Sequence, residues 1–336
     1  MNQLLDRLAQ GRSLTEDQAG RLFDLLVDDA THPAMAGALL AALRTKGETA
    51  EEIRGMARAM RARAIKPDLG NGAPLVDVVG TGGDGSGSFN LSTGAAILAA
   101  AAGARVAKHG NNAISSKAGS ADLLVALGLS LPLAPDEARR LLQACGFTFL
   151  HAPAHHPVLR AIGPVRRALA TRTVFNILGP LCHPAATPFA VIGAYDLNVA
   201  QLMAEALKGL PIERVFVVHG LNGWDEATPA SEFLLLDVRP GKVSSAVRDA
   251  QSLGLRRSTE KELQGGDAAY NARALRNVLA GEPGAHRDAL LLGAALTLEV
   301  AGLECDTARG VERAAAAIDN GAATRVVDML DSSRAR

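Results

Sequence analysis

From Leu75 onward, short apolar runs alternate with segments of helical periodicity. The apolar runs are LVDVVG, ARVAKHG, FTFL, FAVIGAY and RVFVVHG, and the helical segments between them include 120–127, 135–145 and 197–207. Strands that alternate with helices form a largely parallel sheet with helices on both faces. The sequence therefore predicts an α/β fold with a mainly parallel central sheet, and a ligand site beyond the carboxyl ends of its strands.

The first seventy residues show a different pattern from the rest of the chain. They consist of leucine-rich segments with helical periodicity, and no strand-like run interrupts them. Two capping-box patterns, Thr15 with Gln18 and Thr49 with Glu52, mark helix starts. The stretch IKPDLGNGAP at 65–74 is rich in Pro, Gly and Asn, as is typical of a hinge. We expect a helical domain over 1–70, a hinge over 65–74 and an α/β domain over 74–336.

The composition narrows the class of protein. Of 336 residues, 48% are hydrophobic, which is enough for a sizeable core. Lys plus Arg and Asp plus Glu both number 35, so the formal net charge is zero, and aromatic residues make up only 3%. Nucleic-acid binding favours a basic surface with stacking aromatic rings, so no nucleic-acid partner is expected.

Cysteines and apolar stretches indicate the compartment. The three cysteines, Cys145, Cys182 and Cys305, are odd in number and form no CxxC pattern, as in proteins of a reducing compartment. The longest apolar stretch, GAAILAAAAGA at 94–104, is too short to span a bilayer. We expect a cytoplasmic protein with no membrane partner.

The stretch VVGTGGDGSGSFNLST at 78–93 places a run of glycines directly after an apolar run. Gly80, Gly82 and Gly85 satisfy the dinucleotide pattern GxGxxG. The next strand-like run, however, ends in Lys108 instead of an acidic residue that would hold a ribose, and no lysine completes a Walker-type loop. Hydroxyl side chains precede the next helix, where they serve either as a structural N-cap or as part of a phosphate cradle.

A second stretch, KHGNNAISSKAGSAD at 108–122, favours the phosphate cradle. It follows a strand-like run and combines Lys, His, Asn and Ser with almost no residue that a core could use. A solvated loop needs no such density of hydrogen-bond donors, whereas a polyanionic sugar ligand does.

Asp225 and Glu226 are adjacent carboxylates in the loop of VVHGLNGWDEATP, after another strand-like run. Such a pair is commonly an exposed acidic turn, but close carboxylates repel each other unless a cation lies between them. Mg²⁺ takes one or two carboxylates together with phosphate oxygens. Beside two phosphate-suited loops, the pair therefore favours a magnesium site shared with a diphosphate, and such an ion would also offset the charge of Asp84 in the glycine-rich stretch.

Five stretches, in order along the chain, resemble the anthranilate phosphoribosyltransferases, which join anthranilate to phosphoribosyl pyrophosphate (PRPP) in tryptophan biosynthesis. They are GTGGDGSGSFNLST, KHGNNAISSKAGSADLLVALG, HHPVLRAIGPVRRALATRTVFNILGPL, HGLNGWDEATP and GGDAAYNARALRNVLAGEPGAHRDALLLGAALTL. The resemblance implies a small N-terminal helical domain, with a helical return near 171–182, and a larger α/β domain of the nucleoside phosphorylase and phosphoribosyltransferase type. It also implies a homodimer formed by the helical part, Mg²⁺ as the cofactor, and PRPP and anthranilate as the substrates.

The resemblance implies site residues by matching position, with Lys108 and Arg166 as the catalytic residues. For PRPP they are Gly80, Gly83, Asp84, Ser88, Asn90, Leu91, Ser92, Thr93, Lys108, His109, Gly110, Asn111, Asn112, Ala113, Ile114, Ser115, Ser116 and Ser120. For anthranilate they are Gly80, His109, Asn111, Arg166 and Pro180, and for Mg²⁺ they are Ser92, Asp225 and Glu226. The stretch RAIGPVRRALATR independently favours Arg166, because it holds several arginines and no acid, and a carboxylate substrate needs such a donor.

The chemistry implied needs no protein nucleophile. An arylamine would attack C1 of the ribose as Mg-bound pyrophosphate leaves, so the protein positions the reactants and stabilises the leaving group. Closure of the helical domain over the hinge would exclude water that would otherwise hydrolyse the activated ribose.

Several positions depart from the pattern of the family. Asn112 stands where an arginine is usual, which removes a cation beside the substrates, whereas Val125, the pair His183–Pro184 and Gly293 are compatible with changes in packing. Two alternatives remain open. The Asp225–Glu226 pair weighs against an enzyme like the pyrimidine nucleoside phosphorylases, which need no diphosphate metal site, and the retained ligand loops weigh against a non-catalytic paralogue that binds nucleic acid.

Overall fold

The computed structural model describes residues 1–113 and 117–331, and the beginning of the chain forms four helices in it. These are α1 (Asn2–Ala9), α2 (Glu16–Leu26), α3 (Pro33–Lys46) and α4 (Ala50–Ala62). Both capping boxes are present: the Thr15 side chain accepts the N–H of Gln18, and the Thr49 side chain accepts the N–H of Glu52. The helical start of the chain is confirmed.

The described residues form a seven-stranded sheet with the order β3-β2-β1-β4-β5-β6-β7. Five strands pair in parallel and coincide with the five apolar runs. They are β1 (Val76–Gly80), β2 (Val106–Gly110), β3 (Phe147–His151), β4 (Phe189–Gly193) and β5 (Arg214–Gly220). The mainly parallel central sheet is therefore confirmed.

Two further strands, β6 (Phe233–Arg239) and β7 (Lys242–Arg248), extend the sheet as an antiparallel hairpin. The sequence interpretation did not include them. The turn between them is Pro240–Gly241, where Gly241 has a φ of 71°. β7 lies at the edge and is mostly exposed, so it lacks the continuous apolar run by which the buried strands were found.

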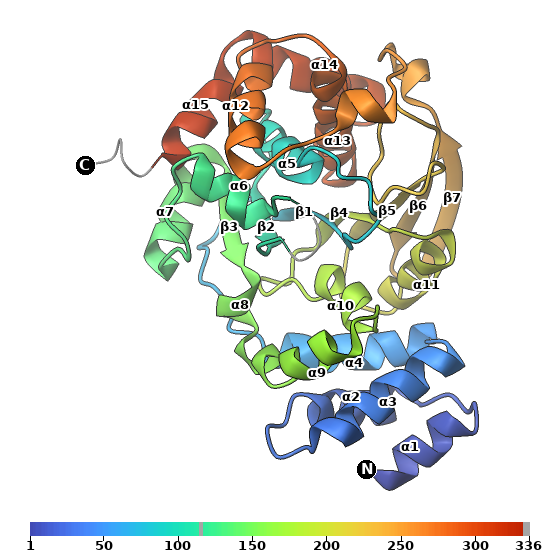
Figure 1. The fold of residues 1–336 in the computed structure, drawn as a ribbon. Coiled ribbons are helices and arrows are strands. Elements are labelled where there is room, and N and C mark those ends of the chain that lie inside the picture. The colour runs from blue at the N-terminus through green and yellow to red at the C-terminus, as the bar shows by residue number, and fades with distance from the viewer. Residues whose placement is uncertain (114–116, 332–336) are drawn as a thin grey trace.

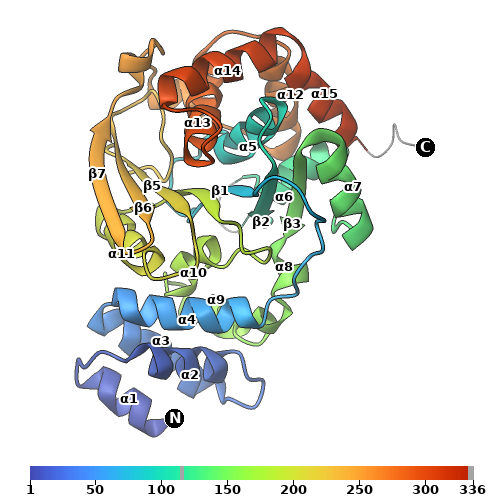
Figure 2. The ribbon, with the colours of Figure 1, turned by 180° about the vertical axis from the view of Figure 1, so that it is seen from behind.

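Helices cover both faces of the sheet (Figure 1, Figure 2). On one face lie α5 (Leu91–Ala101), α12 (Ala268–Leu279), α13 (Ala285–Val300), α14 (Thr307–Asp319) and α15 (Ala322–Leu330). On the other face lie α10 (Phe175–Leu181) and α11 (Leu197–Leu207), with α1–α4 beyond them. The remaining helices are α6 (Ser120–Ala126), α7 (Pro135–Cys145), α8 (Ala152–His155), α9 (Gly163–Leu169) and the 3-10 turns η1 (Pro157–Arg160), η2 (Ala250–Leu253) and η3 (Glu260–Leu263).

Two large apolar cores lie on the two sides of the sheet. One packs α5 and the C-terminal helices against the strands. The other runs from the N-terminal helices to α10, α11 and the opposite face of the sheet, and it contains Phe23, Phe175, Met203 and Val217. The rings of Phe23 and Phe175 lie 6.1 Å apart. The N-terminal helices therefore share a core with the sheet through α10 and α11.

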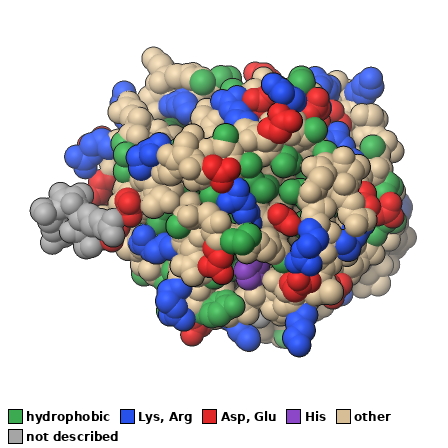
Figure 3. All heavy atoms as spheres, turned by 90° about the horizontal axis from the view of Figure 1, so that it is seen from above, with side chains coloured by type: hydrophobic (Ala, Val, Ile, Leu, Met, Phe, Trp, Pro, Cys, Tyr) green, Lys and Arg blue, Asp and Glu red, His purple; other side chains and the backbone are tan. Residues whose placement is uncertain are grey.

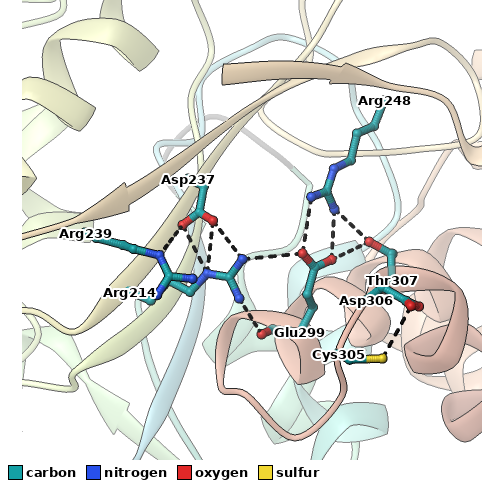
Figure 4. Close-up of polar contacts among 8 residues, drawn as sticks. All are labelled: Arg214, Asp237, Arg239, Arg248, Glu299, Cys305, Asp306 and Thr307. Carbon is teal, nitrogen blue, oxygen red and sulfur yellow. Dashed lines mark hydrogen bonds and ion pairs between the residues drawn. The ribbon is translucent and has the colours of Figure 1, made fainter. Parts of the chain in front are cut away.

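A charged network joins the β5–β7 edge of the sheet to α13 and α14 (Figure 4). Arg214 of β5 donates to Asp237 of β6 at 2.7 Å, and Arg248 of β7 donates to Glu299 of α13 at 2.8 Å. Glu299 is 4% exposed and also accepts the hydroxyl of Thr307 at the start of α14. The network holds the hairpin against the C-terminal helices.

The surface over the C-terminal helices carries mixed charge. Figure 3 shows Lys and Arg side chains interspersed with Asp and Glu on this face, in agreement with the zero net charge of the chain. Within the described residues, the helices are too short or too polar to cross a membrane.

Candidate active site

Glycine is the last residue of four parallel strands, at Gly80, Gly110, Gly193 and Gly220. At two of these positions the missing side chain lets another segment cross the end of the strand. A Cβ on Gly193 would overlap with the backbone carbonyl of Asp225, and a Cβ on Gly80 would overlap with the Asp225 carboxylate. Asp225 therefore lies directly over the carboxyl ends of β1 and β4, where the site was predicted.

The glycine-rich loop after β1 is held to this segment by two carboxylates. Asp225 Oδ2 accepts the N–H of Gly82 at 2.6 Å and the hydroxyl of Thr81 at 3.4 Å. Asp84 accepts the N–H and the hydroxyl of Ser86 at 3.0 and 2.9 Å, and the backbone N–H of Asp225 at 3.2 Å. Asp84 therefore shapes the loop and ties it to the acidic segment. Positive φ angles, which favour glycine, occur at Gly82, Gly83, Gly85 and Gly87.

Asp225 and Glu226 are acids in an unfavourable place for negative charge. Asp225 is 7% exposed, and burial together with the neighbouring Asp84 raises its pKa from 3.8 to about 7. Burial and Asp225 raise the pKa of Glu226 well above its usual value, while Lys108 opposes this shift. A carboxyl group with a raised pKa prefers its neutral form unless a positive charge approaches it. A bound cation would therefore stabilise the ionised form of both carboxyl groups.

Lys108 of β2 is a buried cation in this site, with only 2% of its surface exposed. Its Nζ donates to the carbonyl of Val78 and lies 3.4 Å from Oγ of Ser92 at the start of α5. Burial lowers its pKa, and nearby carboxylates, Asp77 first among them, act in the opposite direction. Glu226 accepts the backbone N–H of Ser92, so Ser92 connects the buried cation to the acidic pair.

The donor set suits magnesium better than a metal cage built by protein alone. Within 1–113 and 117–331, no three His, Cys, Asp or Glu side chains are grouped so that they could hold a metal. Mg²⁺ needs only one or two carboxylates when water and phosphate oxygens complete its octahedron. Asp225 and Glu226 supply such a pair of carboxyl groups.

The second predicted loop, after β2, is tied together by Asp122 of α6. Asp122 Oδ2 accepts the N–H groups of Ala113 and Gly119, both at 2.8 Å. Asn112 Nδ2 donates to Asp122 Oδ1 at 2.7 Å, and Nε2 of His151 lies 2.9 Å from Asn112 Oδ1. Asn112, the departure from the family pattern, therefore braces the loop between Asp122 and His151.

The two predicted PRPP loops lie side by side. Asn90 Nδ2 donates to the carbonyl of Ala118 at 3.0 Å, and the hydroxyl of Ser120 donates to the carbonyl of Asn111 at 3.2 Å. The first loop and the start of α5 hold Gly80, Gly83, Asp84, Ser88, Asn90, Leu91, Ser92 and Thr93. The end of β2 and the second loop hold Lys108, His109, Gly110, Asn111, Asn112, Ala113 and Ser120, whereas Ile114, Ser115 and Ser116 lie outside the described residues.

A cluster of neutral histidines lies between β2 and the segment around α10. His109 is 4% exposed, and its ring centroid lies 5.2 Å from that of His156 and 5.7 Å from that of His183. The backbone N–H of His109 donates to Asp77 Oδ1 at 3.1 Å. Burial lowers the pKa of all three histidines, and that of His156 falls to about 4. The cluster is therefore uncharged at neutral pH.

Arg166 and Pro180, predicted to contact anthranilate, lie in α9 and α10. The guanidinium of Arg166 lies over the ring of Phe175, 5.2 Å from its centroid, and burial lowers its pKa. Among the described residues, no hydrogen bond joins Arg166 or Pro180 to the glycine-rich loop. They form a second group of predicted residues, and Pro180 lies in the helix that precedes Cys182 and His183 of the histidine cluster.

Gly293 of α13, another departure from the family pattern, lines a small cavity together with Ser92 and Glu226. A Cβ at this position would lie 2.7 Å from Cβ of Ala95 in α5. The glycine therefore permits close packing of α13 on α5 and leaves space beside the Glu226 side chain.

Sequence reasoning missed several contributors to the site. Gln264 Nε2 donates to the carbonyl of Ser86 at 2.8 Å, and the N–H of Gly265 donates to the carbonyl of Gly87 at 2.9 Å. These contacts join segments far apart in the chain, so no local pattern indicates them. Three other missed side chains lie within or beside stretches that had been singled out, where a check of each polar residue could have found them: Asp77, Thr81 and His156.

Comparisons with known proteins cover nearly the whole chain. The helical bundle domain of the glycosyl transferase family matches residues 2–64, and the a/b domain of that family matches residues 72–324. An anthranilate phosphoribosyltransferase of Azorhizobium caulinodans is 44% identical over 327 residues, which are 97% of this chain and 94% of that protein. One from Mesorhizobium japonicum is 43% identical over 324 residues, or 96% of each.

Solved structures agree with these matches. Anthranilate phosphoribosyltransferase from Thermus thermophilus superposes with a TM-score of 0.90 at 40% identity, covering 98% of this chain and 99% of that one. The Saccharomyces cerevisiae enzyme in complex with PRPP and Mg has a TM-score of 0.88 at 27% identity, with coverages of 99% and 97%. The identities and coverages confirm the resemblance and the function predicted from the sequence, and the chain belongs to the anthranilate phosphoribosyltransferase family.

Proposed function

We propose that the chain transfers the phosphoribosyl group of PRPP to the amine of anthranilate, with release of pyrophosphate, in a Mg²⁺-dependent reaction. The observation that carries this proposal is the buried pair Asp225 and Glu226, placed over the strand ends next to Lys108 and the glycine-rich loop. The yeast relative that contains PRPP and Mg supports the choice of ligands.

In this proposal the two loops bind PRPP. Backbone N–H groups of positive-φ glycines and of the first turn of α5 are suited to phosphate oxygens, because both present positive partial charge. The second loop, closed by Asp122, presents further donors from the other side. Together they hold the ribose with C1 toward the acceptor.

Ser92, Asp225 and Glu226 would hold Mg²⁺. When bound, the ion offsets the charge that develops on the departing pyrophosphate. The buried Lys108 adds a second positive charge close to Ser92 and Glu226, in surroundings where burial strengthens its effect. As the C1–O bond to pyrophosphate breaks, the C1–N bond forms, and the amine then passes one proton to the released pyrophosphate or to water.

Arg166 would bind the carboxylate of anthranilate, with His109 and Pro180 along the path of the ring and Gly80 and Asn111 near its amine. An uncharged histidine cluster suits this role, since it offers an aromatic substrate polarisable surfaces without a competing cation.

The helical domain and residues 65–74 would act as a lid and a hinge that exclude water during transfer. Residues 65–74 contain neither helix nor strand, in keeping with that role. We further propose a homodimer formed by the helical part, which sedimentation analysis would detect as a doubled mass, and a cytoplasmic location.

The metal assignment is tested with the double substitution Asp225→Asn and Glu226→Gln, which keeps shape and removes charge. We expect the loss of the fluorescence decrease that follows anthranilate consumption with PRPP and Mg²⁺, while the circular dichroism spectrum stays unchanged. The matched control is Asp28→Asn with Asp29→Asn, an adjacent acidic pair on the exposed surface of the helical domain. Wild-type activity in the test variant at low Mg²⁺ would refute the assignment.

A further inference from the structure

The motif GGDAAYNARALRNVL at 265–279 has no role in the reaction described so far, yet it places a buried amide next to the PRPP loops. Asn271 lies in the first turn of α12 and is 1% exposed. A fully buried amide is costly unless its oxygen and its nitrogen both have partners. The contacts of Asn271 are therefore informative about its function.

Asn271 makes two hydrogen bonds that fix its orientation. Its Oδ1 accepts the N–H of Gly266 at 2.8 Å, and its Nδ2 donates to Oδ1 of Asn90 at 2.8 Å. Asn90 in turn donates from its own Nδ2 to the carbonyl of Ala118 at 3.0 Å. In this series of hydrogen bonds, each side-chain amide atom of Asn271 and Asn90 has one partner. The orientation of the Asn271 side chain therefore determines that of the Asn90 side chain.

Asn90 occupies the N-cap position of α5, where an asparagine side chain normally accepts an N–H of the first turn. Here its oxygen is directed to Asn271 instead, and it makes no side-chain cap. In this first turn the Leu91 N–H donates to Phe89 and the Ser92 N–H to Glu226, so among the described residues the N–H of Thr93 is left for an anionic ligand. The Asn90 amide joins the glycine-rich loop to the second loop through Ala118.

The surroundings of Asn271 brace the same loop. The N–H of Phe89 donates to the carbonyl of Leu263 at 2.9 Å, and Gly265 and Gln264 bond to Gly87 and Ser86. The segment that leads into α12 therefore runs along the glycine-rich loop. The hydrogen bond from Asn271 to Asn90 is the last contact between them.

We propose that Asn271 is a positioning residue for PRPP: it turns the Asn90 side chain away from the first turn of α5 and holds the two PRPP loops at their working separation. This inference rests on the proposed function for the identity of the ligand. It predicts a loss of PRPP affinity that does not extend to anthranilate.

Two substitutions test it. Asn271→Asp retains an acceptor for Gly266 but places an oxygen against Oδ1 of Asn90, which forces the Asn90 amide to turn and to lose Ala118. Asn271→Ala removes both bonds and frees Asn90 to cap α5. For each we expect about a tenfold weaker calorimetric Kd for PRPP and a similar rise in its KM, with the KM for anthranilate unchanged.

Asn277→Asp is the control, because Asn277 lies exposed on the same helix. If both Asn271 variants fold and bind PRPP within twofold of this control, the inference is wrong. It is equally wrong if both KM values rise together in step with a lower Tm, since that result indicates a merely structural role. The binding measurement separates this inference from the proposed function: a wild-type protein that binds PRPP but consumes no anthranilate refutes the function alone.

Discussion

Burial decides what the charged residues of the site can do. Asp225 and Glu226 contribute two carboxylates, and Lys108 contributes one ammonium group, all in positions shielded from water. Burial raises the pKa of both carboxyl groups, so they favour the neutral form unless a positive charge approaches them, and a diphosphate brings further negative charge. A site of this composition needs a cation in order to bind its substrate, which is the physical reason for expecting Mg²⁺ dependence.

The histidine cluster predicts a loss of stability in mild acid. The pKa of His156 is lowered from 6.5 to about 4 by burial, so between these values the unfolded chain binds a proton that the folded protein does not. Stability therefore falls as the pH decreases from 6.5 to 4, by on the order of 3 kcal/mol for this residue. Burial shifts the pKa of His109 and His183 in the same direction. Urea unfolding at a series of pH values measures the slope.

His156→Asn should make that slope smaller without abolishing it, because the other two histidines remain. His32→Asn, at an exposed position in the helical domain, is the control and should leave the slope as it is in the wild type. An equal slope in His156→Asn and wild type would contradict the role assigned to burial.

Single residues were predictable where the chemistry of the side chain is unusual for its place. Lys108 within a buried strand and the Asp225–Glu226 pair are of this kind. The role of Asp84 was not predictable in detail, because it accepts the backbone N–H of Asp225, 141 residues away. Asn271 was not predicted either, since an asparagine in a helix is ordinary until its partner is known.

At the scale of elements, the parallel strands and most helices followed from periodicity. Expected helices at 135–145 and 197–207 coincide with α7 and α11, because apolar spacing and a first-turn proline or an Asp cap mark them. In the hairpin, β7 was missed because an edge strand exposed to water needs no apolar run. β6 lies inside the sheet and carries the buried run FLLL, so the sequence could have indicated it. β6 is attached by its pairing with β5 and by core residues such as Phe233 and Leu235. The charged network adds contacts that have no sequence period.

That network yields a prediction for stability. Glu299→Gln removes the charge that faces Arg248 and Arg214 while it keeps the volume of the side chain. We expect a loss on the order of 2 kcal/mol, at the low end for a buried ion pair because both guanidinium groups retain contact with water. Glu312→Gln breaks an exposed ion pair with Arg309 and should cost about 0.5 kcal/mol or less. Similar urea midpoints for the two variants would show that the network does not stabilise the hairpin.

For the whole molecule, the sequence predicted two domains and a hinge but not how they touch. The core that joins α2 to α10 and α11 depends on contacts such as Phe23 with Phe175, which no local pattern encodes.

Arg172 also connects the helical domain to the glycine-rich loop. Its guanidinium donates to the carbonyl of Gly83 and lies 3.9 Å from the ring centroid of Tyr195, while its own carbonyl accepts a hydrogen bond from Arg44 of α3.

This link predicts that the position of the helical domain is transmitted to the glycine-rich loop. Arg172→Ala should lower kcat/KM for PRPP about tenfold, since it releases the Gly83 carbonyl and removes a cation–π contact. Arg44→Ala should have a smaller effect, and the double substitution should cost less than the two single losses together, because both act on one path. Arg167→Ala, exposed on α9, is the control and should behave as wild type. Strict additivity of the Arg44 and Arg172 effects would mean that the helical domain and the loop are independent.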